Sequence, residues 1–325
     1  MSTDRRRFLQ QLSGAAAVLA GASLLGPDVF AAQPPKKLFF KISLAQWSLH
    51  KSLFKKEIDT LDFPRLAREV YQIDAVEYVN QFFKDKVSDQ QYLRQLLRRS
   101  QDYGVVNNMI MIDEESDLGD ADQSKRLKAV EVHSRWADAA RFLGCRMIRV
   151  NAFGAGSKQE AKEAVVDGLG RLGEYCHQIG LQLVTENHGG LSSDAEWLAD
   201  VLRQIGQPYV GSLPDFTNWC LRREGPGFWG GKCLEEYDPY KGVATLMPFA
   251  AGVSAKAFDF DAEGNCLDID YTRMLQIVKD AGYTGYIGIE YEGESLPEKE
   301  GILKTKALLQ RVGARLGEVE GSRRR

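Results

Sequence analysis

Short apolar runs alternate with longer amphipathic segments eight times between residues 38 and 316. A short apolar run bounded by glycine or polar residues predicts a buried strand, and apolar residues spaced by three and four predict a helix. Parallel strands need a crossover connection, which each helical segment can provide. Eight such units in 325 residues favour a single α/β domain, a closed (β/α)8 barrel, over an open doubly wound sheet.

Local signals define the ends of the expected elements. Ser157 with Glu160 three residues later resembles a capping box, Ser193 is a candidate N-cap, and Gly180 is a candidate helix stop. A dinucleotide-binding fold is disfavoured because Gly154-Ala155-Gly156 lacks the third glycine of that motif and follows the fourth strand. The expected strands cover residues 38–47, 75–79, 105–112, 146–152, 181–186, 209–215, 251–260 and 286–291. The expected helices cover residues 62–71, 88–103, 122–143, 157–179, 193–205, 240–247, 270–281 and 298–316.

Composition excludes several classes of protein. The chain is 44% apolar and 27% charged, which is typical of a globular domain and not of a disordered or fibrous chain. Its formal net charge is −3, so there is no basic excess to favour a nucleic-acid or anionic-membrane partner. The oligomeric state is left open, and an oligomer is compatible with this sequence.

The first residues predict export. The N-terminus looks like a twin-arginine signal: Arg5 and Arg6 are followed by Phe8 and Leu9 and by a weak apolar run over 12–26. We therefore expect residues 1–31 to be a signal peptide read by the twin-arginine translocase and the mature protein to be periplasmic or otherwise extracytoplasmic. The apolar run is short for a spanning helix, so no stable membrane anchor is expected, although an uncleaved anchor is the alternative. Residues 32–37 would form a linker, 38–316 the barrel and 317–325 a polar tail.

The five cysteines predict no metal knuckle. Their number is odd and they contain no C-x-x-C pair, so we expect mostly free, buried thiols. Cys220 and Cys233 flank a glycine-rich, aromatic segment within residues 217–241 and could be bridged across it, which is the alternative. That segment is long enough to form a lid over one end of a barrel.

Three acidic residues each close an apolar run. Glu186 ends the fifth predicted strand, Asp215 the sixth and Glu290 the eighth. The C-terminal ends of parallel barrel strands converge on one rim, so these carboxylates should become neighbours and could hold one divalent cation.

Four segments carry a family resemblance: TENHGG, LPDFTNW, VSAKAFDFD and YIGIEYEG. In this order they resemble the xylose isomerase-like TIM barrels known as sugar phosphate isomerases and epimerases, and the similarity extends over about residues 38–316. In that family strands five to eight supply Glu, Asp, His and Glu to a divalent metal, and the two glutamates exchange protons beside a carbonyl. The resemblance implies Glu186, Asp215 and Glu290 as metal ligands and Glu186 with Glu290 as the acid–base pair.

The chain departs from the family pattern at strand seven. The family's histidine should fall at or near Ser254, whereas this sequence offers Lys256 one step further along the same face. The fourth ligand would then be absent, replaced by water or supplied by His188. A set of carboxylates favours Mn²⁺ or Mg²⁺, with Zn²⁺ or Co²⁺ as alternatives. A charged Lys256 could offset the carboxylates and orient or protonate a substrate oxygen, unless it extends to the rim as a surface lysine.

Further polar and aromatic residues suit contacts with sugar hydroxyls. For Glu77 and Arg149 the alternative is a buried pair that braces the barrel, and for Trp47 it is a place in the core. Glu292 follows the last strand in a Glu-Gly-Glu turn and is expected to face solvent. The candidate substrate-binding residues are Trp47, Glu77, Asn108, Arg149, Asn151, Asn187, His188 and Asn218.

The sequence therefore predicts a metal-dependent isomerase or epimerase that acts on a sugar or keto-sugar through an enediolate. A lyase or keto-glycoside-cleaving enzyme would share the first proton abstraction and is an alternative. An exported, non-catalytic sugar-binding protein is a further alternative, because the strand-seven histidine is missing. Related endonuclease barrels are disfavoured, since their multi-zinc site needs many histidines and this chain has four.

Overall fold

The computed structural model of the chain describes residues 38–225 and 230–323. The expected signal peptide, residues 1–31, and linker, residues 32–37, lie outside these residues. Within the described part, no helix has the length and apolar character that a membrane crossing requires.

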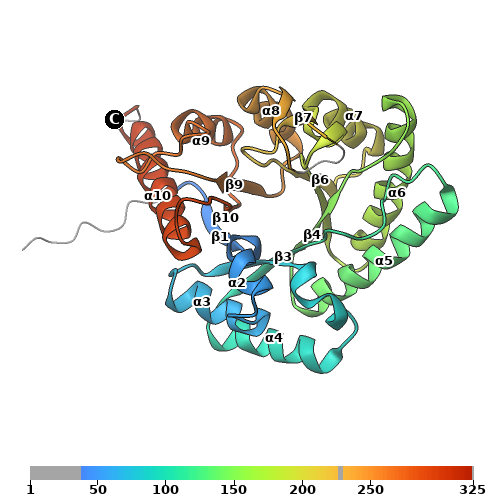
Figure 1. Cartoon of the computed structure of the whole chain (residues 1–325), viewed down its shortest axis with the longest axis horizontal. Helices are drawn as coiled ribbons and strands as arrows, with labels where there is room; N and C mark the ends of the chain where they lie inside the picture. The colour runs from blue at the N-terminus through green and yellow to red at the C-terminus, as the bar shows by residue number, and fades with distance from the viewer. Residues whose placement is uncertain (1–37, 226–229, 324–325) are drawn as a thin grey trace, which may run out of the picture. The chain divides into compact units, whose positions relative to one another are not determined.

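Eight parallel strands form the centre of the fold (Figure 1). Their order in the sheet is β6-β5-β4-β3-β2-β1-β10-β9. Strands that are consecutive along the chain are therefore neighbours, and β6 and β9 are the two outer strands. Backbone hydrogen bonds then join the two outer strands: Ala251 N donates to Ser212 O (3.0 Å) and Ser254 N to Pro214 O (2.9 Å). This closure confirms the predicted barrel. The strands are β1 (Lys41–Ala45), β2 (Ala75–Val79), β3 (Val106–Met111), β4 (Met147–Asn151), β5 (Gln182–Glu186), β6 (Val210–Leu213), β9 (Val253–Ala257) and β10 (Tyr286–Tyr291).

The larger helices surround these strands, as Figure 1 shows. Helix α10 continues to Arg323, further than the sequence indicates, and short helical turns that the sequence analysis did not predict follow β1. The main helices are α3 (Phe63–Glu69), α4 (Gln90–Asp102), α5 (Gln123–Phe142), α6 (Lys158–Gln178), α7 (Ala195–Ile205), α8 (Pro239–Leu246), α9 (Tyr271–Asp280) and α10 (Glu298–Arg323). The shorter ones are η1 (Gln46–Leu49), α2 (His50–Phe54), η2 (Thr60–Asp62), η3 (Asn80–Lys86), η4 (Gly190–Ser193) and η5 (Met247–Phe249).

The helix caps are only partly as predicted. The Ser157 hydroxyl accepts from Glu160 N at 3.2 Å and the Glu160 carboxylate accepts from Ser157 N at 2.9 Å, which confirms the capping box. The cap predicted at Ser193 is wrong, because Asp194 accepts from Trp197 N at the start of α7. Ser193 belongs to η4, and its hydroxyl donates to Asn218 O at 2.6 Å. It therefore braces the loop that follows β6.

A small polar cluster lies inside the barrel. Glu77 Oε1 accepts from Ser43 Oγ at 2.6 Å and from Asn108 Nδ2 at 3.0 Å, and all three residues are buried. A Cβ atom at Gly288 on β10 would lie 2.4 Å from Glu77 Oε2, so a larger residue there would require the Glu77 side chain to shift. Burial raises the pKa of Glu77 to about 7, although both hydrogen bonds oppose the shift. The alternative of a direct Glu77–Arg149 pair is not what the structure shows, because the hydrogen bonds of Glu77 are to Ser43 and Asn108.

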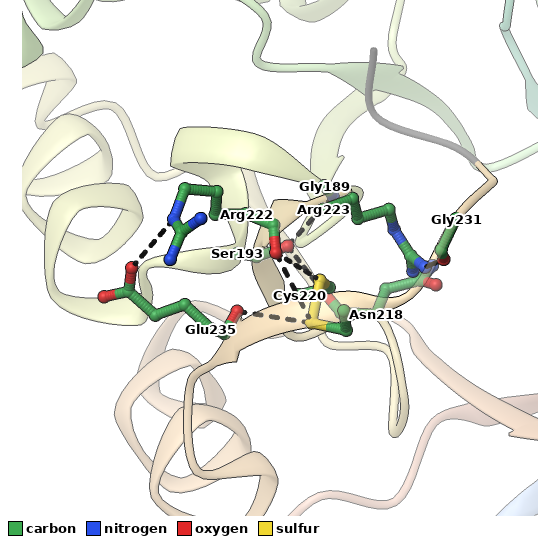
Figure 2. The surroundings of a disulfide bond; sticks show 9 residues. Gly189, Ser193, Asn218, Cys220, Arg222, Arg223, Gly231 and Glu235 are labelled. Atoms are coloured by element: carbon green, nitrogen blue, oxygen red, sulfur yellow. Dashed lines mark hydrogen bonds and ion pairs between the residues drawn. A yellow bond between two sulfur atoms is a disulfide. The ribbon is translucent and has the colours of Figure 1, made fainter. Parts of the chain in front are cut away.

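The segment after β6 contains a disulfide-linked hairpin (Figure 2). Strands β7 (Cys220–Arg223) and β8 (Cys233–Glu236) pair antiparallel and bring Cys220 and Cys233 together, with their Cα atoms 5.8 Å apart. The expectation of free thiols is therefore wrong for this pair. It holds for Cys145, Cys176 and Cys266, which are free and buried.

The thiol count tests this pairing. Protein purified without reductant and then denatured should expose three reactive thiols, and reduction before denaturation should raise the count to five. The reason is that only the bridged pair is protected from a thiol reagent once the chain is unfolded. Five thiols in the unreduced sample would contradict the bridge, and a Cys220→Ser/Cys233→Ser variant that gives three under both conditions is the control.

The pKa of Glu77 predicts a pH-dependent stability. Because burial raises this pKa above its unfolded value, the protonated carboxyl stabilises the fold fully below that unfolded value. The contribution is lost as pH rises through about 7. At about 1.4 kcal/mol per pKa unit, this shift corresponds to a total loss of about 3–4 kcal/mol in the free energy of unfolding.

The measurement is chemical denaturation at a series of pH values between about 5 and about 8. The stability of Glu77→Gln relative to wild type should rise over this range, because glutamine does not ionise. Glu57→Gln, at an exposed position, is the matched control and should follow wild type. A constant difference between Glu77→Gln and wild type would contradict the raised pKa.

Candidate functional site

A cavity of about 460 Å³ opens beside the C-terminal ends of the strands. This volume is within the range of pockets that enclose small ligands. Its wall includes two aromatic side chains, Trp47 and Phe153. The charged and polar side chains in the wall are Gln81, Asp113, Glu114, Glu115, Ser116, Asp117, His133, Arg149, Asn151, His188, Lys256, Glu290 and Glu292.

Lys256 is the buried cation of this site. It extends inward from β9, and its Nζ lies 2.9 Å from Glu290 Oε1 and 2.9 Å from Glu292 Oε1. Burial would lower the pKa of Lys256, but the surrounding carboxylates, Glu290 first, raise it well above its ordinary value. The lysine therefore stays charged. Its side chain is only 2% exposed, so the alternative of a surface lysine is wrong, as is the solvent-facing position expected for Glu292.

Glu290 forms part of the cavity wall. Burial raises the pKa of its carboxyl, and the neighbouring Lys256 ammonium opposes that shift. Because Glu290 is on β10 and Lys256 on β9, the parallel register places them directly across from one another. A carboxylate and an ammonium thus meet in the cavity wall, where both can contact one bound molecule.

Glu186 is tied to protein groups and does not line the cavity. Its Oε2 lies 2.9 Å from Arg149 Nε, and its Oε1 accepts from Asn218 Nδ2 at 3.0 Å. The same arginine contacts both oxygens of Asp113, at 2.6 Å and 3.1 Å. Burial raises the pKa of Glu186 well above its usual range, against the opposing effect of Arg149. The contacts assign Glu186 a part in fixing Arg149 and Asn218.

Asp215 lies directly after Pro214 and also faces protein donors. Its Oδ1 accepts from the backbone N–H groups of Thr217 (2.8 Å) and Asn218 (2.9 Å). Its Oδ2 accepts from Ser254 Oγ at 2.6 Å. Ser254 is the position at which the family resemblance leads one to expect histidine. Here its hydroxyl serves as a donor to the carboxylate, so both oxygens of Asp215 are engaged.

The predicted metal ligands do not fit a divalent cation as they stand. Among residues 38–225 and 230–323, no group of three His, Cys, Asp or Glu side chains is placed to hold a metal ion. Each of the three predicted ligands is bound by the chain itself: Glu290 by Lys256, Glu186 by Arg149 and Asn218, and Asp215 by Ser254 and backbone N–H groups. A cation would have to displace these donors.

The other predicted residues divide into two groups. Trp47, Asn151 and His188 line the cavity with Arg149. His188 Nδ1 lies 2.7 Å from Asn151 Oδ1, and burial lowers its pKa well below the ordinary value, so it is neutral. The second group, Glu77, Asn108, Asn187 and Asn218, is absent from the cavity wall.

Two of that second group position the loop after β6. Asn187 Nδ2 donates to Asp215 O at 3.1 Å and to Asn218 O at 3.3 Å, while its Oδ1 accepts from Asp215 N at 2.8 Å. The Asn218 amide then connects Glu186 to Lys256, since Lys256 Nζ lies 3.4 Å from Asn218 Oδ1. These asparagines orient the charged groups without reaching the cavity.

Sequence reasoning missed Asp113, Glu115 and Phe153. Asp113 lies two residues after β3, as Asp215 lies two residues after β6, so the same strand-end signal could have identified it. Burial acts to raise the pKa of Asp113, but the Arg149 guanidinium outweighs it and holds this pKa well below its usual range. Asp113 is therefore an anion that fixes Arg149 in the wall.

Solved structures share this fold at low sequence identity. A xylose isomerase-like TIM barrel protein from Mycobacterium smegmatis, in complex with magnesium, is 14% identical (TM-score 0.60; 85% of this chain and 97% of that chain covered). A D-psicose 3-epimerase is 11% identical (TM-score 0.64; 85% and 100%). The 3-keto-D-glucoside 4-epimerase of E. coli is 13% identical (TM-score 0.59; 85% and 100%).

No curated protein matches the sequence at a significant level. The family model of the xylose isomerase-like TIM barrels matches residues 65–312, a range that begins in α3 and ends in α10 and so includes seven of the eight barrel strands. With the closed barrel described above, this match shows that the chain belongs to the xylose isomerase-like TIM barrel family.

Proposed function

We propose that this protein is a sugar isomerase or epimerase that moves a proton at a carbon next to a carbonyl group. The observation that carries the proposal is Glu290, a carboxylate in the cavity wall 2.9 Å from the buried ammonium of Lys256. Proton transfer at such a carbon needs a base and a group that stabilises negative charge on oxygen. The epimerases that share this fold support the same reaction class.

In the proposed reaction Glu290 removes the proton. The electron pair of the C–H bond forms a C=C bond, and the carbonyl π pair moves to oxygen, where an N–H of Lys256 stabilises the charge. Addition of a proton to the other face of the carbon by a second acid group gives the epimer. Return of the proton to the former carbonyl carbon, with transfer of the hydroxyl proton between the two oxygens, gives the isomer. A C–H beside a carbonyl is too weak an acid for a carboxylate in water, so this charge stabilisation is essential.

A second acid–base group is needed to complete the reaction. The family resemblance implies Glu186, but this carboxylate contacts Arg149 and Asn218 and is not among the residues of the cavity wall. Its part in proton transfer stays a prediction. Glu292, which is in the wall and 2.9 Å from Lys256, is placed to exchange protons with a bound sugar.

The charge of the cavity favours an uncharged sugar or keto-sugar. Six carboxylate side chains line it, whereas its two cations, Arg149 and Lys256, are already paired with carboxylates. A phosphorylated substrate would bring more negative charge against this wall at a cost. Trp47 and Phe153 offer apolar surfaces to the C–H faces of a sugar ring. The predicted metal dependence is not part of the proposal, because the donor set does not fit a dication.

Deuterium exchange tests this function. Free and 3-keto sugars incubated with the enzyme in D₂O should gain deuterium at the carbon beside the carbonyl, detected by NMR or mass spectrometry. Glu290→Gln should slow exchange by about 10²-fold or more, since an amide cannot accept the proton. Glu294→Gln, at an exposed position on the same loop, is the matched control and should keep the wild-type rate.

Two outcomes would contradict the proposal. Exchange by Glu290→Gln at the wild-type rate would remove this glutamate from the chemistry. Absence of exchange with every sugar that binds would favour a non-catalytic sugar-binding protein. Glu186→Gln, assayed in parallel, separates a role in proton transfer from the bracing role that its contacts show.

We also propose that residues 1–31 are a twin-arginine signal peptide and that the protein acts outside the cytoplasm. Support comes from Arg5 and Arg6, which precede Phe8 and Leu9 and a weak apolar run. Arg5→Lys/Arg6→Lys should leave the protein in the cytoplasm, measured by cell fractionation, because twin-arginine export depends on both arginines. Unchanged export of this variant would contradict the proposal, and Arg65→Lys, within α3 of the barrel, is the control.

A further inference from the structure

We infer that the ammonium group of Lys256 takes the place of the divalent cation at this barrel rim, so that the site neutralises its carboxylates and stabilises the substrate anion without a bound metal. The inference deepens the proposed isomerase or epimerase function and rests on it for the second of these roles. The first role, neutralising the carboxylates in place of a dication, is independent of any catalytic activity.

The position of Lys256 is the first observation. It lies on β9 two residues after Ser254, so both side chains point to the interior of the barrel. Its Nζ contacts Glu290 at 2.9 Å and approaches Asn218, whose amide contacts Glu186. The lysine is thus placed among the side chains that the family resemblance assigns to a metal, with a positive charge of its own.

The second observation concerns the coordination sites that a metal would need. Both oxygens of Asp215 accept hydrogen bonds from the chain. Glu186 Oε1 accepts from Asn218, whereas Glu186 Oε2 accepts no hydrogen bond and lies 2.9 Å from the Arg149 guanidinium cation. Ser254, at the position of the expected histidine, is one of those donors. A dication would have to break these contacts and also approach a fully buried ammonium of the same sign.

The third observation is that an ammonium can do the required chemistry. Lys256 has three N–H donors, directed to Glu290, Glu292 and Asn218, and the contact with Asn218 is the longest at 3.4 Å. A substrate carbonyl oxygen can replace that amide oxygen. When Glu290 takes the proton from carbon, the electron pair becomes the C=C bond and the oxygen that gains the charge accepts from Lys256. A proton then added to the other face of that carbon or to the former carbonyl carbon gives the product, and release of the proton held by Glu290 restores the carboxylate, so no oxidant or reductant is consumed.

A metal titration tests the inference. Wild-type protein, dialysed against chelator, should show no stoichiometric Mn²⁺ binding by calorimetry or equilibrium dialysis. Lys256→Met, which keeps the apolar stem and removes the charge, should bind Mn²⁺ at least about tenfold more tightly, because unneutralised carboxylates attract a cation. Lys241→Met, a change at an exposed lysine, is the matched control and should behave as wild type.

Equal Mn²⁺ affinity of wild type and Lys256→Met, at any level, would overturn the inference. If Lys256→Met does not fold, Lys256→Ala is the second variant. One Mn²⁺ bound per wild-type chain would by itself overturn the inference. Deuterium exchange by the wild type should be unchanged after chelator treatment. Loss of exchange in Glu290→Gln reports on the proposed function, whereas the Mn²⁺ titration does not depend on turnover, so the two failures are distinguishable.

Discussion

The organisation of the barrel rim depends on one buried cation. Lys256, 2% exposed, lies between Glu290 and Glu292 at 2.9 Å from each. Carboxylates from neighbouring strands would repel one another in a region of low dielectric constant unless positive charge is placed among them. Removing one partner of a buried ion pair typically costs about 3–5 kcal/mol, because the other charge is left uncompensated. The lysine therefore contributes to the fold of the rim as well as to its chemistry.

A second cation repeats this arrangement on the other side of the site. Arg149 contacts Asp113 through two nitrogens and Glu186 through a third. The Asn218 side chain contacts both Glu186 and Lys256, and so connects the group around Arg149 to the group around Lys256. Its backbone carbonyl accepts a hydrogen bond from the Ser193 hydroxyl. Cys220, two residues further along, begins the disulfide-linked hairpin, so the loop that carries Asn218 is anchored at both ends (Figure 2).

Much of the fold follows from local sequence patterns. The strands predicted at 75–79 and 286–291 agree in both bounds with β2 and β10, because each is a short apolar run with a sharp polar or glycine boundary. The capping box at Ser157 is likewise a local pattern. The predicted N-cap at Ser193 is wrong because Ser193 and Asp194 are adjacent and both are residue types that cap helices. Only the geometry of the preceding turn makes Asp194 the N-cap of α7.

The site was predicted less completely, because its pairings join distant residues. The carboxylates at 186, 215 and 290 are at the barrel rim, as their strand-end positions indicate, but the sequence does not show which partner each one meets. Glu292 was assigned to solvent although Lys256, 36 residues earlier, binds it. Cys220 and Cys233 are brought together only by the pairing of β7 with β8. Contacts between residues far apart in the sequence can be identified only once the fold is known.

Anomalous X-ray diffraction from crystals grown with Mn²⁺ would test the central claim most directly. We expect no manganese peak among Glu186, Asp215 and Glu290, and density for the Lys256 ammonium at hydrogen-bond distance from Glu290. A manganese peak bonded to oxygens of those three carboxylates, with Lys256 turned away from Glu290, would contradict it.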